Sequence, residues 1–139
     1  MLRLWGRLSS INVRKVVLCA QVLGLDLERI DAGLQFGIVN TPEFLALNPN
    51  GLVPTLQDES FVLWESNAIL RYLARKYDQN GRYPADINSQ ASADKWMDWQ
   101  LTTFWPMIRP AFLGLTRTPE NDRNYDLIRK GYETASGQL

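Results

Sequence analysis

The fold of this chain is decided by Asn48-Pro49-Asn50-Gly51-Leu52-Val53-Pro54-Thr55-Leu56, which is followed at a short distance by Glu65-Ser66. The stretch predicts a tight turn, a Val-Pro bond that leads into an apolar strand, a second short strand and the start of a helix. Proline cannot donate to a sheet ladder, and X-Pro is the one type of peptide bond that adopts the cis form at low cost. The Val-Pro pair is therefore expected at an edge, where the backbone of Val53 can pair with an extended peptide.

Glu65 and Ser66 complete this pattern at the start of the predicted helix. The first N–H groups of a helix have no partner within the helix, so they attract a carboxylate. The Glu65 carboxylate and the Ser66 hydroxyl add an acceptor for an ammonium group and a donor for a carboxylate. We interpret the whole stretch as a clamp for a small peptide that carries a free α-amino acid end.

Composition excludes several classes of function. The 139 residues include 15 Lys plus Arg and 15 Asp plus Glu, and this balance favours neither nucleic acid nor an anionic membrane as a partner. The absence of histidine excludes His-based general-base catalysis and His-ligated metal sites within the sequence. The single cysteine, Cys19, is typical of a reducing compartment, and neither a membrane span nor a leader segment is recognisable. We therefore expect a cytoplasmic protein without a bound metal.

Hydrophobic periodicity predicts alternating strands and helices in the first half of the chain. The expected strands are residues 2–5, 27–30, 55–57 and 61–63, and the expected helices are residues 12–24, 42–47 and 65–77. Gly24 is expected to end the first helix, and Thr41 is expected to cap the second, which begins with Pro42. The order is β-α-β-α-β-β-α, with the Val-Pro bond before the third strand.

The second half is expected to be helical. A long helix over residues 89–114 should kink or break at Pro106 and Pro110, and a further helix should run over residues 119–136. A polar segment with glycine and proline separates the halves. The expected division is a first domain at 1–78, a linker at 79–88 and a partial helical domain at 89–139.

The ordered set of motifs resembles the glutathione S-transferase family, in a bacterial, serine-type form of theta- or phi-like character. The segments that carry the resemblance are Leu2–Trp5, Ser9–Val16, Thr41–Phe44, Asn48–Leu56 and Glu65–Leu73. The resemblance implies an α/β thioredoxin-like N-terminal domain followed by an all-helical C-terminal segment. Because family members usually carry a larger helical domain, we expect this segment to be incomplete, as in a C-terminally truncated member.

The resemblance also implies a thiol-activating residue near the first helix. The first tyrosine, Tyr72, comes too late for a tyrosine-type member, and Cys19 is expected to belong to the core. Ser10 is the predicted catalytic residue, with Ser9 and Asn12 as alternatives, although Ser10 in this position is also typical of a plain helix cap. A hydrogen bond to a charged group contributes about 1.5–3 kcal/mol. This matches the ~2.7 kcal/mol needed to lower a thiol pKa by about two units.

The remaining site residues follow from the same resemblance. The backbone of Val53, beside Pro54, is expected to pair with the cysteinyl part of glutathione. Glu65 is expected to receive the γ-glutamyl ammonium, and Ser66 to donate to the γ-glutamyl carboxylate. The family often has a basic residue for the glycyl carboxylate in the loop before the second helix, where this chain has Asn40, which offers only a neutral hydrogen bond.

These expectations describe a glutathione S-transferase of the kind that serves detoxification. It would add the thiolate of glutathione, its co-substrate, to a small hydrophobic electrophile, and it would act as a homodimer. Two alternatives stay open: a non-catalytic glutathione-fold binding or interaction module, and a glutathione-dependent isomerase or dehalogenase with the same clamp. Large apolar side chains of the helical segment, among them Trp96, Trp99 and Trp105, are expected to be partly uncovered and to favour self-association.

Overall fold

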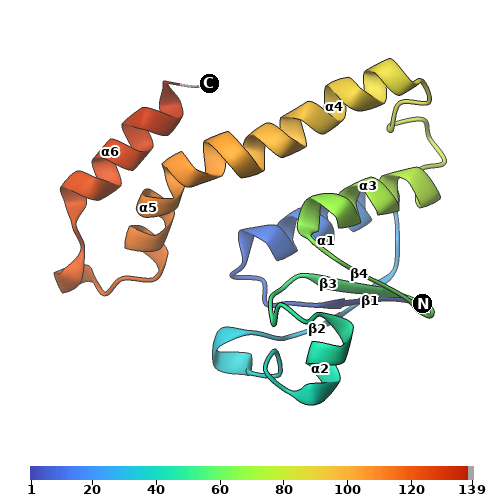
Figure 1. Cartoon of the computed structure of the whole chain (residues 1–139), viewed down its shortest axis with the longest axis horizontal. Coiled ribbons are helices and arrows are strands. Elements are labelled where there is room, and N and C mark those ends of the chain that lie inside the picture. Colours follow the sequence, from blue (N-terminus) through green and yellow to red (C-terminus); the bar gives the residue numbers. More distant parts are fainter. Residues whose placement is uncertain (138–139) are drawn as a thin grey trace. The chain divides into compact units, whose positions relative to one another are not determined.

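The computed structural model describes residues 1–137 and divides the chain into two compact units, Met1–Ala85 and a second unit that begins at Asp86 (Figure 1). The first unit contains a four-stranded sheet in the order β2-β1-β3-β4. Its strands are β1 (Leu2–Trp5), β2 (Leu27–Ile30), β3 (Thr55–Asp58) and β4 (Phe61–Trp64). Strand β1 is parallel to β2 and antiparallel to β3, and β3 is antiparallel to β4.

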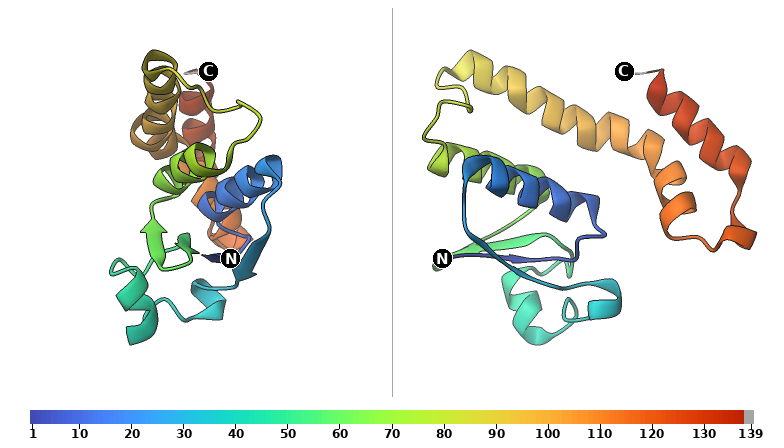
Figure 2. Two further views of the ribbon diagram at one scale, coloured as in Figure 1. Left: turned by 90° about the vertical axis from the view of Figure 1, so that its right-hand side faces the viewer. Right: turned by 180° about the vertical axis from the view of Figure 1, so that it is seen from behind.

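Helices cover both faces of this sheet. Helices α1 (Ile11–Leu23) and α3 (Ser66–Tyr77) pack against each other on one face, and α2 (Pro42–Leu47) lies on the other face (Figure 2). A short 3₁₀ turn, η1 (Leu34–Phe36), lies in the segment between β2 and α2. The element order and the strand pairing confirm the thioredoxin-like fold.

The core of the first unit lies between the sheet and the pair α1 and α3. Strand β1 alternates, so that Leu2 and Leu4 are buried while Arg3 faces outward and pairs with Glu28 of β2 at 2.7 Å. The helices contribute residues at three- and four-residue spacing. The buried cluster consists of Leu2, Leu4, Val13, Val16, Leu56, Ile69 and Leu73. Each such side chain contributes about 1.5–3 kcal/mol when it is fully buried.

Two of the predicted helix ends, the start of α2 at Thr41 and the end of α1 at Gly24, are confirmed. Thr41 accepts a hydrogen bond from the Phe44 N–H at 3.3 Å, and Pro42 occupies the first position of α2. Gly24 ends α1 with φ 69°, a left-handed conformation that favours glycine. The short patterns around these residues were therefore sufficient to place both ends.

Within residues 86–137, the second unit contains three α-helices, a π-helical segment and connecting turns. Helix α4 (Ile87–Trp99) continues through a π-helical segment, η2 (Gln100–Phe104), into α5 (Trp105–Thr116), and the chain bends there without losing its helical backbone (Figure 1). A π segment widens the turn, which accommodates the missing N–H group of Pro106. The expected kink is thus confirmed, and the helical backbone continues through both Pro106 and Pro110.

Helix α6 (Tyr125–Ser136) begins later than expected. Residue 119 was predicted to open this helix, but a 3₁₀ turn, η3 (Glu120–Asp122), occupies this place instead. The side chain of Asn124 accepts a hydrogen bond from the Leu127 N–H at 2.9 Å and caps the helix. Because this cap sets the start of α6, the predicted start at residue 119 is wrong.

Small residues set the contact between α5 and α6. Ala111 and Ala135 are each 2% exposed, and Gly131 is also buried. A Cβ atom on Gly131 would lie 3.1 Å from the Met107 carbonyl oxygen and 3.3 Å from the Ala111 nitrogen. The two helices therefore approach so closely that a side chain at residue 131 does not fit without a shift.

Candidate functional site

A hollow lies on the first unit beside the N-terminal ends of α1 and α3 and the turn that follows α2. Its volume is about 70 Å³, and it is lined by Asn12, Asn48, Asn50, Leu52, Val53, Pro54, Trp64, Glu65 and Ser66. The structure thus brings together all four clamp residues predicted between positions 53 and 66, and one of the three thiol-activating candidates. Ser9, Ser10 and Asn40 are not among the lining residues.

Asn48 organises the turn that forms one wall of the hollow. It is 2% exposed, and its Nδ2 atom donates to the Leu52 carbonyl oxygen at 2.9 Å and to Thr55 Oγ1 at 3.0 Å. Its Oδ1 atom accepts hydrogen bonds from both the backbone N–H and the side-chain amide of Asn50. The side-chain amide of Asn48 thus holds the turn through both its nitrogen and its oxygen. These hydrogen bonds also satisfy its own polar atoms, which would otherwise be costly to bury.

The Val53–Pro54 peptide bond follows this turn and is cis. Pro54 is buried, and Val53 is half-buried and lines the hollow. The pairing of β3 with β1 begins only at Thr55, opposite Trp5. The backbone of Val53 therefore lies beyond the paired part of the strand, at the wall of the hollow.

Asn40 lies next to this turn and outside the hollow. Gly51 has φ 61°, and a Cβ atom there would lie 3.1 Å from the Val39 carbonyl oxygen and 3.6 Å from Asn40 Oδ1. Only glycine combines this conformation with so close an approach. The segment before α2 is thus held against the turn, and the side chain of Asn40 is exposed and does not line the hollow.

The start of α3 forms the opposite wall. Glu65 occupies the cap position with φ 72° and ψ 110°, and its side chain makes no capping hydrogen bond. A non-glycine residue in such a conformation costs about 1–3 kcal/mol and is typical of functional sites. Ser66 is the first residue of α3 and is buried. An exposed carboxylate thus stands beside a hydroxyl and the N–H groups of a helix start, which suits an ammonium and a carboxylate on one carbon.

The two serines before α1 differ in their surroundings. Ser10 is the cap residue of α1 and is 9% exposed, but its side chain makes no capping hydrogen bond. Its backbone N–H donates to the Arg7 carbonyl oxygen at 3.1 Å, and its own carbonyl accepts from the Arg14 N–H at 3.0 Å. Ser10 thus occupies the cap position that the plain-cap interpretation expected, but its hydroxyl is not used to cap α1. Ser9 is exposed.

Cys19 has the structural role expected from the sequence. It is half-buried and packs against the core cluster of the first unit. Burial raises the pKa of its thiol, so the reactive thiolate form is disfavoured.

Lys15, which was not predicted as a site residue, contacts the first turn of α3. Lys15 of α1 donates from Nζ to Asn67 Oδ1 at 2.8 Å. Burial lowers the pKa of Lys15, and the nearby Glu65 carboxylate raises it. This role has little signal in the sequence, because a lysine at a half-exposed position of a helix is ordinary.

Four lining residues were also missed as site residues: Asn48, Asn50, Leu52 and Trp64. All four lie within or directly beside the motifs that predicted the clamp, so proximity in the sequence was the available signal. Within residues 1–137, no group of three or more Cys, Asp or Glu side chains is arranged to hold a metal ion. The helices of the same part of the chain are too short or too polar to cross a membrane.

Comparisons with known proteins agree with this geometry. The profile of the family "Glutathione S-transferase, N-terminal domain" matches residues 1–75. "Glutathione S-transferase GstB" of Escherichia coli (strain K12) is 48% identical over 130 residues, which cover 92% of this chain and 62% of the relative. "Glutathione S-transferase 3" of Zea mays is 38% identical over 120 residues, which cover 85% of this chain and 54% of the relative. The chain therefore spans less than two thirds of the length of both curated relatives.

Two solved structures are similar to this chain over almost its whole length. The theta class glutathione S-transferase from the citrus canker pathogen Xanthomonas axonopodis pv. citri, with glutathione bound, has a TM-score of 0.93 and 45% identity. That match covers 99% of this chain and 66% of the solved chain. Glutathione transferase F2 from Populus trichocarpa has a TM-score of 0.87 and 25% identity, with coverage of 99% and 66%.

Proposed function

The chain belongs to the glutathione S-transferase family, and we propose that it binds glutathione in the hollow between α1, the turn at Asn48–Pro54 and α3. There it would add the glutathione thiolate to a small hydrophobic electrophile. The observation that carries this proposal is the meeting of Val53, Glu65 and Ser66 at one hollow. These residues offer, side by side, a backbone edge, a carboxylate and a hydroxyl at a helix start.

Each part of glutathione has a matching group in the proposed site. The cysteinyl backbone pairs with Val53, whose position beside the buried Pro54 lies beyond the ladder of β3. The γ-glutamyl ammonium faces the Glu65 carboxylate, and the γ-glutamyl carboxylate faces the Ser66 hydroxyl and the first N–H groups of α3. Asn40, next to the turn at Gly51, is the proposed neutral donor to the glycyl carboxylate.

Activation of the thiol requires a donor near the start of α1. We assign this role to Ser10, with Ser9 and Asn12 as the alternatives. Support for Ser10 comes from its hydroxyl, which does not serve the N–H groups of α1. Support for Asn12 comes from its place in the lining of the hollow. A hydrogen bond from Ser10 or from Asn12, together with the N-terminus of a helix, supplies the stabilisation that a thiolate needs, about 1.5–3 kcal/mol.

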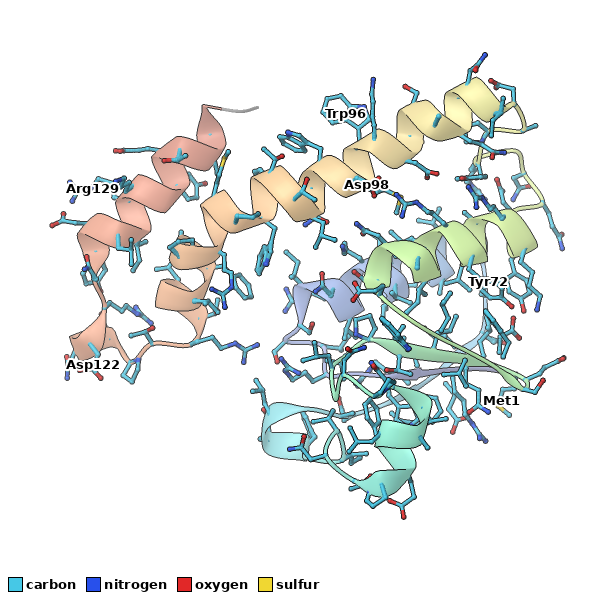
Figure 3. All side chains as sticks on the ribbon, in the orientation of Figure 1. Met1, Tyr72, Trp96, Asp98, Asp122 and Arg129 are labelled. Carbon is cyan, nitrogen blue, oxygen red and sulfur yellow. The ribbon has the colours of Figure 1, made fainter. Side chains whose placement is uncertain are left out.

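The proposal extends to the assembly and location of the protein. The second unit exposes large apolar side chains, including Trp96 at 59% and Leu127 at 51%, and Trp96 projects from α4 (Figure 3). Exposed apolar surface of this kind is typical of an interface. A homodimer in the cytoplasm, with residues 1–78 as the glutathione-binding domain and 79–88 as the linker, is our working description.

Calorimetric titration with glutathione tests the proposed function. The wild-type chain should bind glutathione, and Ser66→Ala should weaken binding by about 1–3 kcal/mol, because a charged carboxylate loses a donor. Helix content by circular dichroism should be unchanged. Ser60→Ala, in the turn between β3 and β4, is the matched control and should bind like the wild type. Absence of wild-type binding would overturn the proposal.

An assay with a panel of hydrophobic electrophiles then separates the two classes of function. Turnover that depends on glutathione supports the transferase. Tight binding of glutathione without turnover of any electrophile favours the interaction module, which is the alternative from a different class.

A further inference from the structure

We propose that Lys15 of α1 is a positioning residue of the glutathione site, which holds the first turn of α3 in place through Asn67 and Glu65. This inference rests on the proposed function and deepens it. Lys15 does not line the hollow, so its action on a ligand is indirect. Asn67 and Glu65 directly follow and precede Ser66 in the chain.

The contact between Lys15 and Asn67 joins two helices across a long stretch of sequence. The Nζ atom of Lys15 lies 2.8 Å from Asn67 Oδ1, and the two residues are separated by 52 positions. Asn67 is 7% exposed, and Lys15 is half-buried. A lysine ammonium only donates, so the side-chain amide of Asn67 must present its oxygen to Lys15. A charge-assisted hydrogen bond in a half-buried place is stronger than an exposed one.

Glu65 is the second group that Lys15 influences. Burial lowers the pKa of the Lys15 ammonium, and the nearby carboxylate of Glu65 acts in the opposite direction. Glu65 has a positive φ, a conformation that persists only where the surroundings hold it. The bond to Asn67 and the attraction to Glu65 together provide such surroundings on the side of α1.

The position of Lys15 on α1 connects this contact to the ligand. Asn12 lies three residues earlier and therefore on the same side of the helix, and Asn12 lines the hollow. Ser66 lines the hollow from α3 and directly precedes Asn67. The Lys15–Asn67 bond thus ties the two walls together next to the end that would hold the γ-glutamyl group. Loss of this bond should affect binding of that group and leave the thiol end unchanged.

Lys15→Met tests this inference, because it keeps the length of the side chain and removes the charge and the donor. We expect the Kd for glutathione, measured by calorimetry, to rise about tenfold, at the lower end of the range for a charged hydrogen bond. The pKa of the bound glutathione thiol, measured by ultraviolet difference titration, should stay as in the wild type. Lys15→Arg should restore most of the affinity, and Lys130→Met, at an exposed position of α6, should bind like the wild type.

Asn67→Leu provides an independent variant with its own prediction. It removes the acceptor and should raise the Kd by a similar factor, while Lys15→Met in the Asn67→Leu background should add little further loss. If the losses of glutathione affinity in the two single variants add up in the double variant, Lys15 does not act through Asn67, and the inference is overturned. An equal disturbance of the Kd and of the bound-thiol pKa would show a general structural role and would also overturn the inference.

The outcome for the wild type separates this inference from the proposed function. Wild-type binding combined with unchanged binding by Lys15→Met and Asn67→Leu would overturn the positioning role alone. No binding by the wild type would overturn both.

Discussion

The hydroxyl of Tyr72 on α3, which is labelled in Figure 3, donates a hydrogen bond to the carboxylate of Asp58 at the end of β3 at 2.7 Å. Lys76 Nζ and the Tyr77 hydroxyl reach the same carboxylate oxygen, each at 2.6 Å. Asp58 is 4% exposed. Its carboxylate therefore attaches the C-terminal half of α3 to the sheet, while the N-terminal end of the same helix forms a wall of the candidate site.

The first prediction concerns the dependence of stability on pH. Burial raises the pKa of Asp58, but the hydrogen bonds from Lys76, Tyr77 and Tyr72 outweigh it and lower the pKa to about 2. Because the folded-state pKa is below the unfolded value of about 3.9, the stabilisation is fully present above that value and is lost as the pH falls toward about 2. Urea unfolding of the wild type between pH 7 and pH 2 should show this loss.

Asp58→Asn should remove this contribution at neutral pH, with a cost of about 1–3 kcal/mol in the free energy of unfolding. Its stability should depend less on pH in the acid range than that of the wild type. Asp122→Asn, at an exposed turn of the second unit, serves as the control. Identical pH profiles for the wild type and Asp58→Asn would contradict the anchoring role of Asp58.

A second prediction follows from the positive φ of Glu65. Glu65→Gly should raise the free energy of unfolding by about 1 kcal/mol, because glycine adopts this conformation without the steric cost. The same change should abolish glutathione binding, since the carboxylate is lost. Glu65→Gln keeps the strained backbone, so it should lose affinity without any gain in stability. Thermal melting and calorimetry of the three proteins measure both effects.

The third prediction identifies the group that activates the thiol. Ser10→Ala should leave the Kd for glutathione nearly unchanged and raise the pKa of the bound thiol by about one to two units, because a hydrogen bond to the anion is lost. The rate of conjugation should fall at neutral pH and recover at high pH, where the thiol ionises unaided. If Asn12→Ala or Ser9→Ala shows this behaviour and Ser10→Ala does not, the assignment passes to that residue.

A fourth prediction concerns the close contact between α5 and α6. Gly131→Ala should destabilise the second unit by about 1–3 kcal/mol, because the added Cβ lies 3.1 Å from a backbone carbonyl oxygen that cannot move freely. Ser136→Ala, at an exposed position of the same helix, adds no such contact and should be neutral. Chemical unfolding followed by tryptophan fluorescence reports on the change, because α4 and α5 carry the nearby tryptophans.

Elements with local signals could be predicted from the amino-acid sequence. Strands β1 and β2 were predicted with the bounds that the structure shows, because alternation of apolar and polar residues over a few positions is enough to define them. The same holds for α2, which begins with a capping threonine and a proline. The clamp motif was predictable for a related reason, since its members lie close together in the chain and resemble a known family.

The tertiary structure alone decided how distant residues act on one another. Asp58 was expected in the turn between two strands, yet the structure makes it the last residue of β3 and gives it three donors from α3. The contact of Lys15 with Asn67 and the role of Asn48 inside its turn likewise appear only once the chain has folded back on itself. Local patterns restrict the backbone near a residue, whereas burial, charge and hydrogen bonding depend on neighbours that the sequence places far away.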